Sequence, residues 1–308
     1  TLKNLLQVQR LELQQASLRT FFSPVVVEAI RNRNAEEILA PRKCDVTVLF
    51  CDLRGFSKAS EAMSDDLLGL LERVSESLGI MTSTILDCGG VVGDFHGDAV
   101  MGFWGWPLDV SDLRKNAANA VKAALKIQTR FYKSLSQQRN SKCKLDNFHV
   151  GLGLASGEAV AGKIGTRDQV KVTVFGPVVN LAARLEGMTR QLNSVVLADR
   201  ETVNRLTEPA PGSLEHPIHR LLGTFQPFGL ERNVDVFQLA VAGAMLPKDV
   251  ENYHVAIDQF TAGNWSAAQS TLQTISESDS ARLFLESLMA GRDTAPSDFE
   301  GIIRMTNK

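Results

Sequence analysis

Two aspartates each stand beside short apolar runs of the sequence. Asp52 ends the run Asp45–Asp52 (DVTVLFCD), and Asp98 lies in the short segment 96–98 (HGD) between two apolar runs. Taken singly, an aspartate in such a place is usually a turn former or a helix cap. Acting together, two carboxylates would suit Mg²⁺, which takes few protein carboxylates and completes its shell with water and phosphate oxygens.

A polar pair lies further along the chain, on a segment that is predicted to be helical. Asn180 and Arg184 are four residues apart in PVVNLAARLE (177–186), so their side chains share one helix face. The segments 157–165 (GEAVAGKIG) and 172–176 (VTVFG) precede them. Arginine keeps its charge and offers several donors in a planar fork, which suits a phosphate, although the pair alone would be an ordinary polar helix face.

Together these segments resemble the catalytic domain of the class III adenylate and guanylate cyclases. The motifs are Leu49–Ser57 (LFCDLRGFS), Gly97–Met101 (GDAVM) and the segment 157–186, and the resemblance covers residues 45–240. Chance is a poor explanation for three motifs in the family's order. The resemblance implies an enzyme that converts a nucleoside triphosphate into a 3′,5′-cyclic monophosphate and pyrophosphate.

The resemblance also implies a role for each group. Asp52 and Asp98 would hold two Mg²⁺ or Mn²⁺ ions per site, and Asn180 would orient the ribose. Arg184 would stabilise the charge on the α-phosphate in the transition state. The turn after the first strand would wrap the triphosphate with its backbone N–H groups, and its glycine permits the close approach. The residues of this turn are Leu53, Arg54, Gly55, Phe56 and Ser57.

In this family the active site lies between two domains arranged head to tail. One domain supplies the metal carboxylates, and the other supplies the base-reading and transition-state residues. The chain has both sets, so the resemblance implies a homodimer with two equivalent sites. In each site Asp52 and Asp98 of one subunit would face four residues of the other subunit: Asp94, Thr173, Asn180 and Arg184.

The residue expected to read the base departs from the adenylate cyclase pattern. Adenylate cyclases usually have a lysine four residues before the hairpin aspartate, which donates to N1 of adenine, and guanylate cyclases have a glutamate there. Here the residue is Asp94, and a carboxylate can only accept, which suits the N1–H and N2–H₂ groups of guanine. The hydroxyl of Thr173 can donate to guanine O6 or accept from adenine N6–H₂. We therefore expect GTP or ATP as the substrate, with GTP favoured.

A second departure concerns the terminal phosphates. Family members typically place Lys or Arg beside the last glycine of a motif that reads LGTFQPFGL here, at 222–230. The neighbours of Gly229 are instead the apolar residues Phe228 and Leu230. Either the triphosphate is held more weakly, or its charge is met by another basic residue: Arg220, Arg232 or Lys163.

The elements around the motifs predict an α+β fold, with helices packed on an antiparallel-rich, ferredoxin-like sheet. Short continuous apolar runs predict strands, and apolar spacings of three and four predict amphipathic helices. The helix at 64–87 should bury Leu67, Leu71, Val74, Leu78, Met81 and Ile85. The other expected elements are a strand at 45–52, a hairpin at 91–104, a helix at 112–137, a strand at 148–155, a β segment to 176, a helix at 178–192 and a β-rich stretch to Leu239.

Two further segments flank the catalytic domain, which is expected at 43–240. Residues 1–20 are rich in Leu and Gln, which predicts a helix, either docked on its own domain or forming a short coiled-coil connector. The need for a dimer favours the connector. Residues 250–290 resemble a tetratricopeptide-like hairpin of two helices around Gly263-Asn264. One such unit cannot bury its own apolar face, so it should pack on the catalytic domain or on a partner.

The composition of the chain argues against several other classes of function. The chain has 308 residues, 44% of them hydrophobic and 22% charged, which is ordinary for a soluble globular protein. A net charge of −2 gives no electrostatic case for nucleic acid or a membrane surface. Four cysteines without CxxC spacing favour free thiols, and therefore a cytoplasmic location, over zinc or disulfides. The chain starts within a helical pattern, so we expect an upstream sensory domain, which could be attached to a membrane, to be missing.

Other functions fit the sequence less well. A cyclase-like module that binds nucleotide and signals without catalysis would be favoured by loss of a metal aspartate, Asn180 or Arg184, and none is lost. A cyclic dinucleotide synthase also uses two carboxylates on a similar sheet, but Gly97-Asp98-Ala99 does not match its Gly-Gly-(Asp/Glu)-Glu-Phe hairpin. A helical interaction protein does not account for the site residues.

Overall fold

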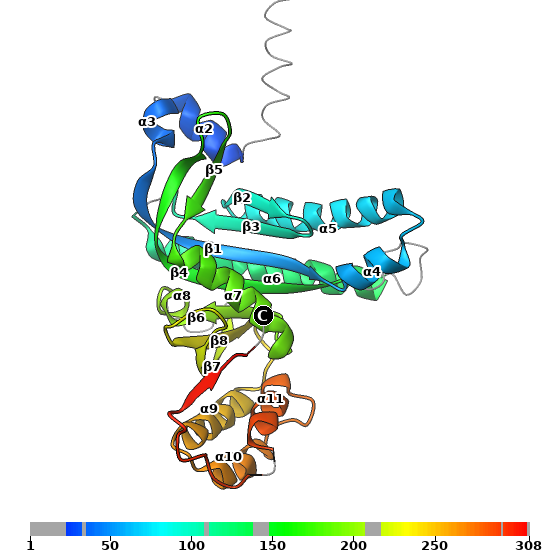
Figure 1. Cartoon of the computed structure of the whole chain (residues 1–308), viewed down its shortest axis with the longest axis vertical. Coiled ribbons are helices and arrows are strands. Elements are labelled where there is room, and N and C mark those ends of the chain that lie inside the picture. Colours follow the sequence, from blue (N-terminus) through cyan, green and yellow to red (C-terminus); the bar gives the residue numbers. More distant parts are fainter. Residues whose placement is uncertain are drawn as a thin grey trace, which may run out of the picture.

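The computed structural model describes residues 23–32, 35–107, 111–137, 148–206, 217–290 and 292–306. The connector helix predicted at 1–20 lies outside these ranges. Within them the chain forms an α+β structure around one large sheet (Figure 1), as the sequence predicts. Two helices that were not predicted, α2 (Pro24–Asn32) and α3 (Ala35–Leu39), precede the first strand.

The sheet is built around β1 (Arg42–Arg54), which is hydrogen-bonded on both sides, to β3 and β4. The strand order is β2-β3-β1-β4-β6-β8-β7-β9, with β5 paired to β4 outside this path. The pairs β4–β6 and β7–β9 are parallel, and the other pairs are antiparallel. The remaining strands are β2 (Val91–His96), β3 (Ala99–Trp104), β4 (His149–Gly165), β5 (Val170–Phe175), β6 (Val196–Asp199), β7 (Ile218–Gln226), β8 (Val234–Ala240) and β9 (Ile302–Arg304).

Helices cover both faces of the sheet, so β1 is buried on both sides. α5 (Leu67–Asp87) and α6 (Leu113–Gln137) pack against the odd-numbered side chains of β1. α7 (Pro177–Gln191) packs against the even-numbered side chains. Since successive side chains of a strand point to opposite faces, Asp52 and Arg54 near the end of β1 lie on the α7 side.

The prediction for the inward face of α5 is partly wrong. Met81 and Ile85 are fully buried as expected, but Leu67 and Leu71 are 66% and 60% exposed, and Leu70 turns inward instead. The helix projects past the ends of β2 and β3 (Figure 1), and its buried face begins at Leu70 and continues through Val74. Helical periodicity therefore identified the helix correctly but chose the wrong leucines of its N-terminal part as the buried ones.

The cysteines that the structure describes are buried thiols. Cys44, Cys51 and Cys88 are free and buried, and Cys143 lies outside the described residues. Burial raises the pKa of the Cys51 thiol well above its usual value, so the reactive thiolate is scarce. Among the helices of the described ranges, none combines the length and the apolarity needed to cross a membrane.

The C-terminal unit continues the sheet. Three helices follow β8, where the sequence predicted two: α9 (Pro247–Thr261), α10 (Trp265–Leu272) and α11 (Ser280–Met289). They lie at the opposite end of the molecule from α2, α3 and β5 (Figure 1). β9 then pairs with β7, an addition that the sequence did not predict. The unit shares a core with the sheet, which is one of the two arrangements expected for it.

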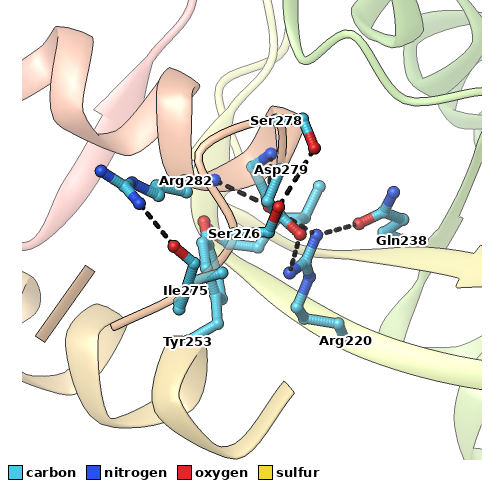
Figure 2. A network of polar contacts seen from close by, with 10 residues as sticks. Arg220, Gln238, Tyr253, Ile275, Ser276, Ser278, Asp279 and Arg282 are labelled. Atoms are coloured by element: carbon cyan, nitrogen blue, oxygen red, sulfur yellow. Dashed lines mark hydrogen bonds and ion pairs between the residues drawn. The ribbon is translucent and has the colours of Figure 1, made fainter. Parts of the chain in front are cut away.

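A buried ion pair anchors this C-terminal unit (Figure 2). Arg220 of β7 is 1% exposed and donates to both carboxylate oxygens of Asp279 at 2.9 and 3.1 Å, and to Gln238 at 2.6 Å. Its guanidinium lies 4.7 Å from the ring centroid of Tyr253 in α9. Asp279 also caps the start of α11. Arg220 is thus buried and paired with Asp279, so the suggestion that it could bind terminal phosphates is wrong.

We expect Asp279→Ala to lower the free energy of unfolding by about 3–5 kcal/mol, because it leaves the Arg220 charge buried without a partner. The matched control is Glu300→Ala, which removes an ion pair to Arg304 whose side chains are 62% and 59% exposed. That change should cost about 0–1 kcal/mol. Urea unfolding of both variants provides the comparison, and equal losses would show that the buried network does not anchor the unit.

Candidate active site

The structure brings the two predicted metal ligands together at one end of the sheet. Asp52, near the end of β1, pairs with Ala99 of β3 in the strand register. Asp98 directly precedes Ala99 in the turn between β2 and β3. Gly97 opens this turn with a φ of 66°, a value that residues with side chains rarely adopt. The hairpin therefore sets Asp98 beside Asp52.

Burial and mutual repulsion act on this pair of carboxylates. Burial, followed by the negative charge of Asp98, raises the pKa of Asp52 to about 6, although Arg190 opposes the shift. Burial also raises the pKa of Asp98. A raised pKa means that the ionised form is disfavoured, so a bound cation would stabilise the pair.

The donor set fits a magnesium-type ion. Within the described part of the chain, no group of three or more His, Cys, Asp or Glu residues forms a preformed metal cage. Mg²⁺ does not need one, because one or two carboxylates commonly hold it together with substrate phosphates and water. Mn²⁺ accepts the same oxygen ligands. Asp52 and Asp98 thus suit ions that arrive with a nucleotide.

A third carboxylate, which the sequence analysis missed, belongs to the same centre. Burial, followed by the charge of Asp52, raises the pKa of Glu186 in α7 to about 7, and Arg54 and Arg190 act in the opposite direction. Glu186 and Arg190 are four residues apart and therefore share a helix face. That spacing is visible in the sequence, but only the packed structure shows that this face meets Asp52.

In the turn predicted to wrap phosphates, the side chains of Leu53, Arg54 and Phe56 contact the rest of the chain. Leu53 is 2% exposed in the core, and the Arg54 guanidinium donates to the carbonyl oxygen of Ser194 at 3.1 Å. Gly55 takes a φ of 94° and leads into α4 (Phe56–Ala62), whose first residue packs on the core. Ser57 lies in the first turn of α4. Contact between this turn and a triphosphate stays a prediction.

Gly153 lets α7 lie directly on β4. A Cβ atom at Gly153 would be 2.2 Å from the backbone nitrogen of Glu186 and 2.3 Å from the carbonyl oxygen of Ala182. Real Cβ atoms do not approach backbone so closely, so this packing requires glycine. At Gly151 a Cβ atom would meet side-chain atoms instead, with Oε1 of Glu186 at 2.7 Å. The packing at Gly153 fixes the distance between α7 and the carboxylates of β1.

The predicted ribose and transition-state residues lie on a different face of α7. Asn180 is exposed, and Arg184 is half-buried with Nη2 3.3 Å from the Cβ position of Gly229, in the turn between β7 and β8. At 100° per residue, this face lies about 120° around the helix from the face of Glu186 and Arg190. α7 therefore presents one charged face to the carboxylates of its own chain and another face away from them.

The predicted base-reading residues lie on β2 and β5, two strands that are not paired with each other in the sheet but contact each other. Asp94 of β2 forms an ion pair with Lys171 of β5, and Thr173 follows two residues later on the same strand. His96 lies near Asp94 as well, with Nε2 3.8 Å from Oδ2. Lys171 was not singled out from the sequence, because a cation 77 residues away gives no local signal.

Comparison with known proteins decides the family. The family described as the adenylate and guanylate cyclase catalytic domain matches residues 38–213, more than half of the chain. The chain belongs to this family. Its fold and its class of enzyme, both predicted from the motifs, are thereby confirmed.

Individual cyclases are similar to this chain over its catalytic domain. Adenylate cyclase 1 of Rhizobium meliloti (strain 1021) is 30% identical over 195 residues, which cover 63% of this chain and 27% of that protein. The chain thus spans about a quarter of that relative. The crystal structure of the adenylyl cyclase CyaB from P. aeruginosa is 26% identical with a TM-score of 0.58, covering 68% of this chain and 100% of that chain. The guanylyl cyclase Cya2 is also 26% identical, with a TM-score of 0.51 and coverage of 66% and 95%.

We expect Gly153→Ala to displace α7, because the added methyl group would overlap two backbone atoms of that helix. Overpacking of this kind costs about 1–3 kcal/mol, and cyclase activity should fall sharply as Arg184 moves with the helix. Gly187→Ala on the same helix is the control, because its Cβ would meet nothing within 4 Å. It should leave stability unchanged or raise it by up to about 1 kcal/mol. Thermal unfolding and product assays test both, and an unaffected Gly153→Ala protein would refute the packing argument.

Proposed function

We propose that the chain is the catalytic part of a homodimeric nucleotide cyclase, which converts a purine nucleoside triphosphate into its 3′,5′-cyclic monophosphate and pyrophosphate. The proposal rests on the two polar faces of α7, one with Glu186 and Arg190 and the other with Asn180 and Arg184. Glu186 and Arg190 act on Asp52 of their own chain. The face of Asn180 and Arg184 points elsewhere, so it serves the carboxylates of a second subunit arranged head to tail.

The reaction needs one bond made and one broken. The ribose 3′ oxygen attacks the α-phosphorus and loses its proton, and the bond from the α-phosphorus to the bridging oxygen of the β-phosphate breaks. Bound Mg²⁺ or Mn²⁺ would lower the pKa of the 3′-hydroxyl and neutralise the departing pyrophosphate. Asp52 and Asp98 would hold these ions, while Asn180 orients the ribose. Arg184 stabilises the charge on the α-phosphate as it develops, because its guanidinium cannot lose its proton.

We expect Asp98→Ala and Arg184→Ala each to abolish product formation as homodimers. Mixed in equal amounts with free subunit exchange, half of the dimers would be heterodimers with one complete site, so about a quarter of wild-type activity should return. The matched control mixes Asp98→Ala with Asp52→Ala, because both changes damage the same half-site and no complete site can form. Formation of the cyclic product with Mg²⁺ and with Mn²⁺ is the readout.

Each failure of this experiment has its own meaning. No recovery in the first mixture, despite demonstrated subunit exchange, would contradict a shared site. Near-full activity of either aspartate variant would contradict the metal assignment. A wild-type protein that binds nucleotide but forms no cyclic product with either ion would support the non-catalytic signalling module instead.

A further inference from the structure

The ion pair between Asp94 and Lys171 changes what the base-reading position offers to a nucleotide. Nζ of Lys171 lies 2.7 Å from Oδ1 and 2.9 Å from Oδ2 of Asp94, so the ammonium group contacts both oxygens. Oδ1 also accepts from the backbone N–H of Phe95 at 2.9 Å. The preference for GTP drawn from the sequence assumed that this carboxylate was free to accept from guanine. In the structure both of its oxygens already accept hydrogen bonds from the protein.

The negative charge of Asp94 is stable over the physiological range. Partial burial acts to raise the pKa of Asp94, but the hydrogen bonds from Lys171 and from the Phe95 amide outweigh it and hold the pKa below its usual value. The carboxylate therefore stays ionised and keeps its partner. Its side chain is 21% exposed, whereas that of Lys171 is 55% exposed. The group that this pair presents to a ligand is thus the ammonium, which has three donors and no acceptor.

The position of Lys171 on its strand places it beside the other base-reading residue. Lys171, Thr173 and Phe175 alternate along β5 and therefore share one face. Lys171 and Thr173 are about 7 Å apart along the strand, within reach of one purine edge. Phe175 on the same face is 72% exposed and offers an apolar ring surface. One face of β5 thus combines a donor, a hydroxyl and an aromatic ring.

We infer that Lys171 is the residue that reads the base, that Asp94 is a positioning residue which holds its ammonium group, and that the substrate is ATP. Adenine presents N1 as an acceptor for this ammonium, and its N6–H₂ group can donate to the Thr173 hydroxyl. Guanine would place its N1–H donor against the ammonium, and unmatched polar groups in a closed site are strongly rejected. This inference rests on the proposed cyclase function.

The alternative is a surface ion pair without a role in recognition, which contributes little to stability. Loss of such a pair would change the rates with ATP and GTP equally. A base-reading pair changes their ratio. The ratio of kcat/KM for ATP to that for GTP therefore separates the two cases.

The test uses the full chain with Mg²⁺ and compares wild type with Lys171→Ala, Asp94→Asn and the exchange of both charges, Asp94→Lys with Lys171→Asp. We expect wild type to prefer ATP. Lys171→Ala should lower the ATP:GTP ratio at least about tenfold, and Asp94→Asn should lower it less, because the lysine remains but is no longer held. The double exchange should recover most of the preference, since it restores a paired ammonium at the same place. Lys122→Ala, an exposed change on α6 against the other face of the sheet, is the control and should leave the ratio unchanged.

Measurements of nucleotide binding distinguish failure of this inference from failure of the cyclase proposal. The 3′-deoxy forms of ATP and GTP lack the attacking hydroxyl, and calorimetry gives their affinities for the same proteins without any turnover. ATP-selective binding that Lys171→Ala abolishes would support the inference even if wild type formed no product. A wild type that prefers GTP, or a ratio within about twofold of wild type in Lys171→Ala by both assays, would overturn it.

Discussion

The backbone contact between α7 and β4 is the constraint on which the candidate site depends. Gly153 has no Cβ, so the backbone of α7 lies directly on the strand. This close approach brings Glu186 and Arg190 to the carboxylates at the end of β1. The same helix carries Arg184 to the turn at Gly229. A single packing distance therefore sets the position of both charged faces of the helix.

The carboxylate centre cannot relieve its own repulsion by moving. Asp52 belongs to a strand that is hydrogen-bonded to β3 on one side and to β4 on the other. Asp98 is held by a tight hairpin turn, and Glu186 by the helix packing just described. Fixed carboxylates in a partly buried place shift their pKa values upward instead of separating, as Asp52 and Glu186 show. A cation held by Asp52 and Asp98, as proposed above, would relieve this repulsion without requiring the carboxylates to move.

The elements that depend on local sequence patterns were predicted correctly. The hairpin around Asp98, the strand that ends near Asp52 and the helix that carries Asn180 and Arg184 were all expected, because turn residues and apolar periodicity lie close together in the chain. The exposure of Leu67 was not predictable, since the leucine-rich start of α5 offers more than one apolar face and only packing selects Leu70. β9 was missed because a three-residue strand is identified by its partner β7 rather than by its own composition.

The same limit explains the charged residues that were assigned wrongly or overlooked. Arg220 looked available for phosphate because the partner that holds it, Asp279, lies 59 residues later in the chain. Asp94 looked like a free acceptor because its partner, Lys171, lies 77 residues away on another strand. A sequence motif shows which residue type occupies a position. Whether that residue still has hydrogen-bonding capacity for a ligand depends on partners that only the fold supplies.

Both ends of the described chain are tied to strands that carry site residues. The hydroxyl of Ser23, just before α2, accepts from the backbone N–H of Val92 at 2.9 Å, and Asp94 follows on the same strand. At the other end, the N–H of Met305 donates to the carbonyl oxygen of Gln226 at 3.0 Å, directly before the turn that lies against Arg184. α2 is therefore coupled to the base-reading side, and the C-terminal unit to the transition-state side. Each connection runs through one strand, so the two ends of the described chain are tied to two different groups of predicted site residues.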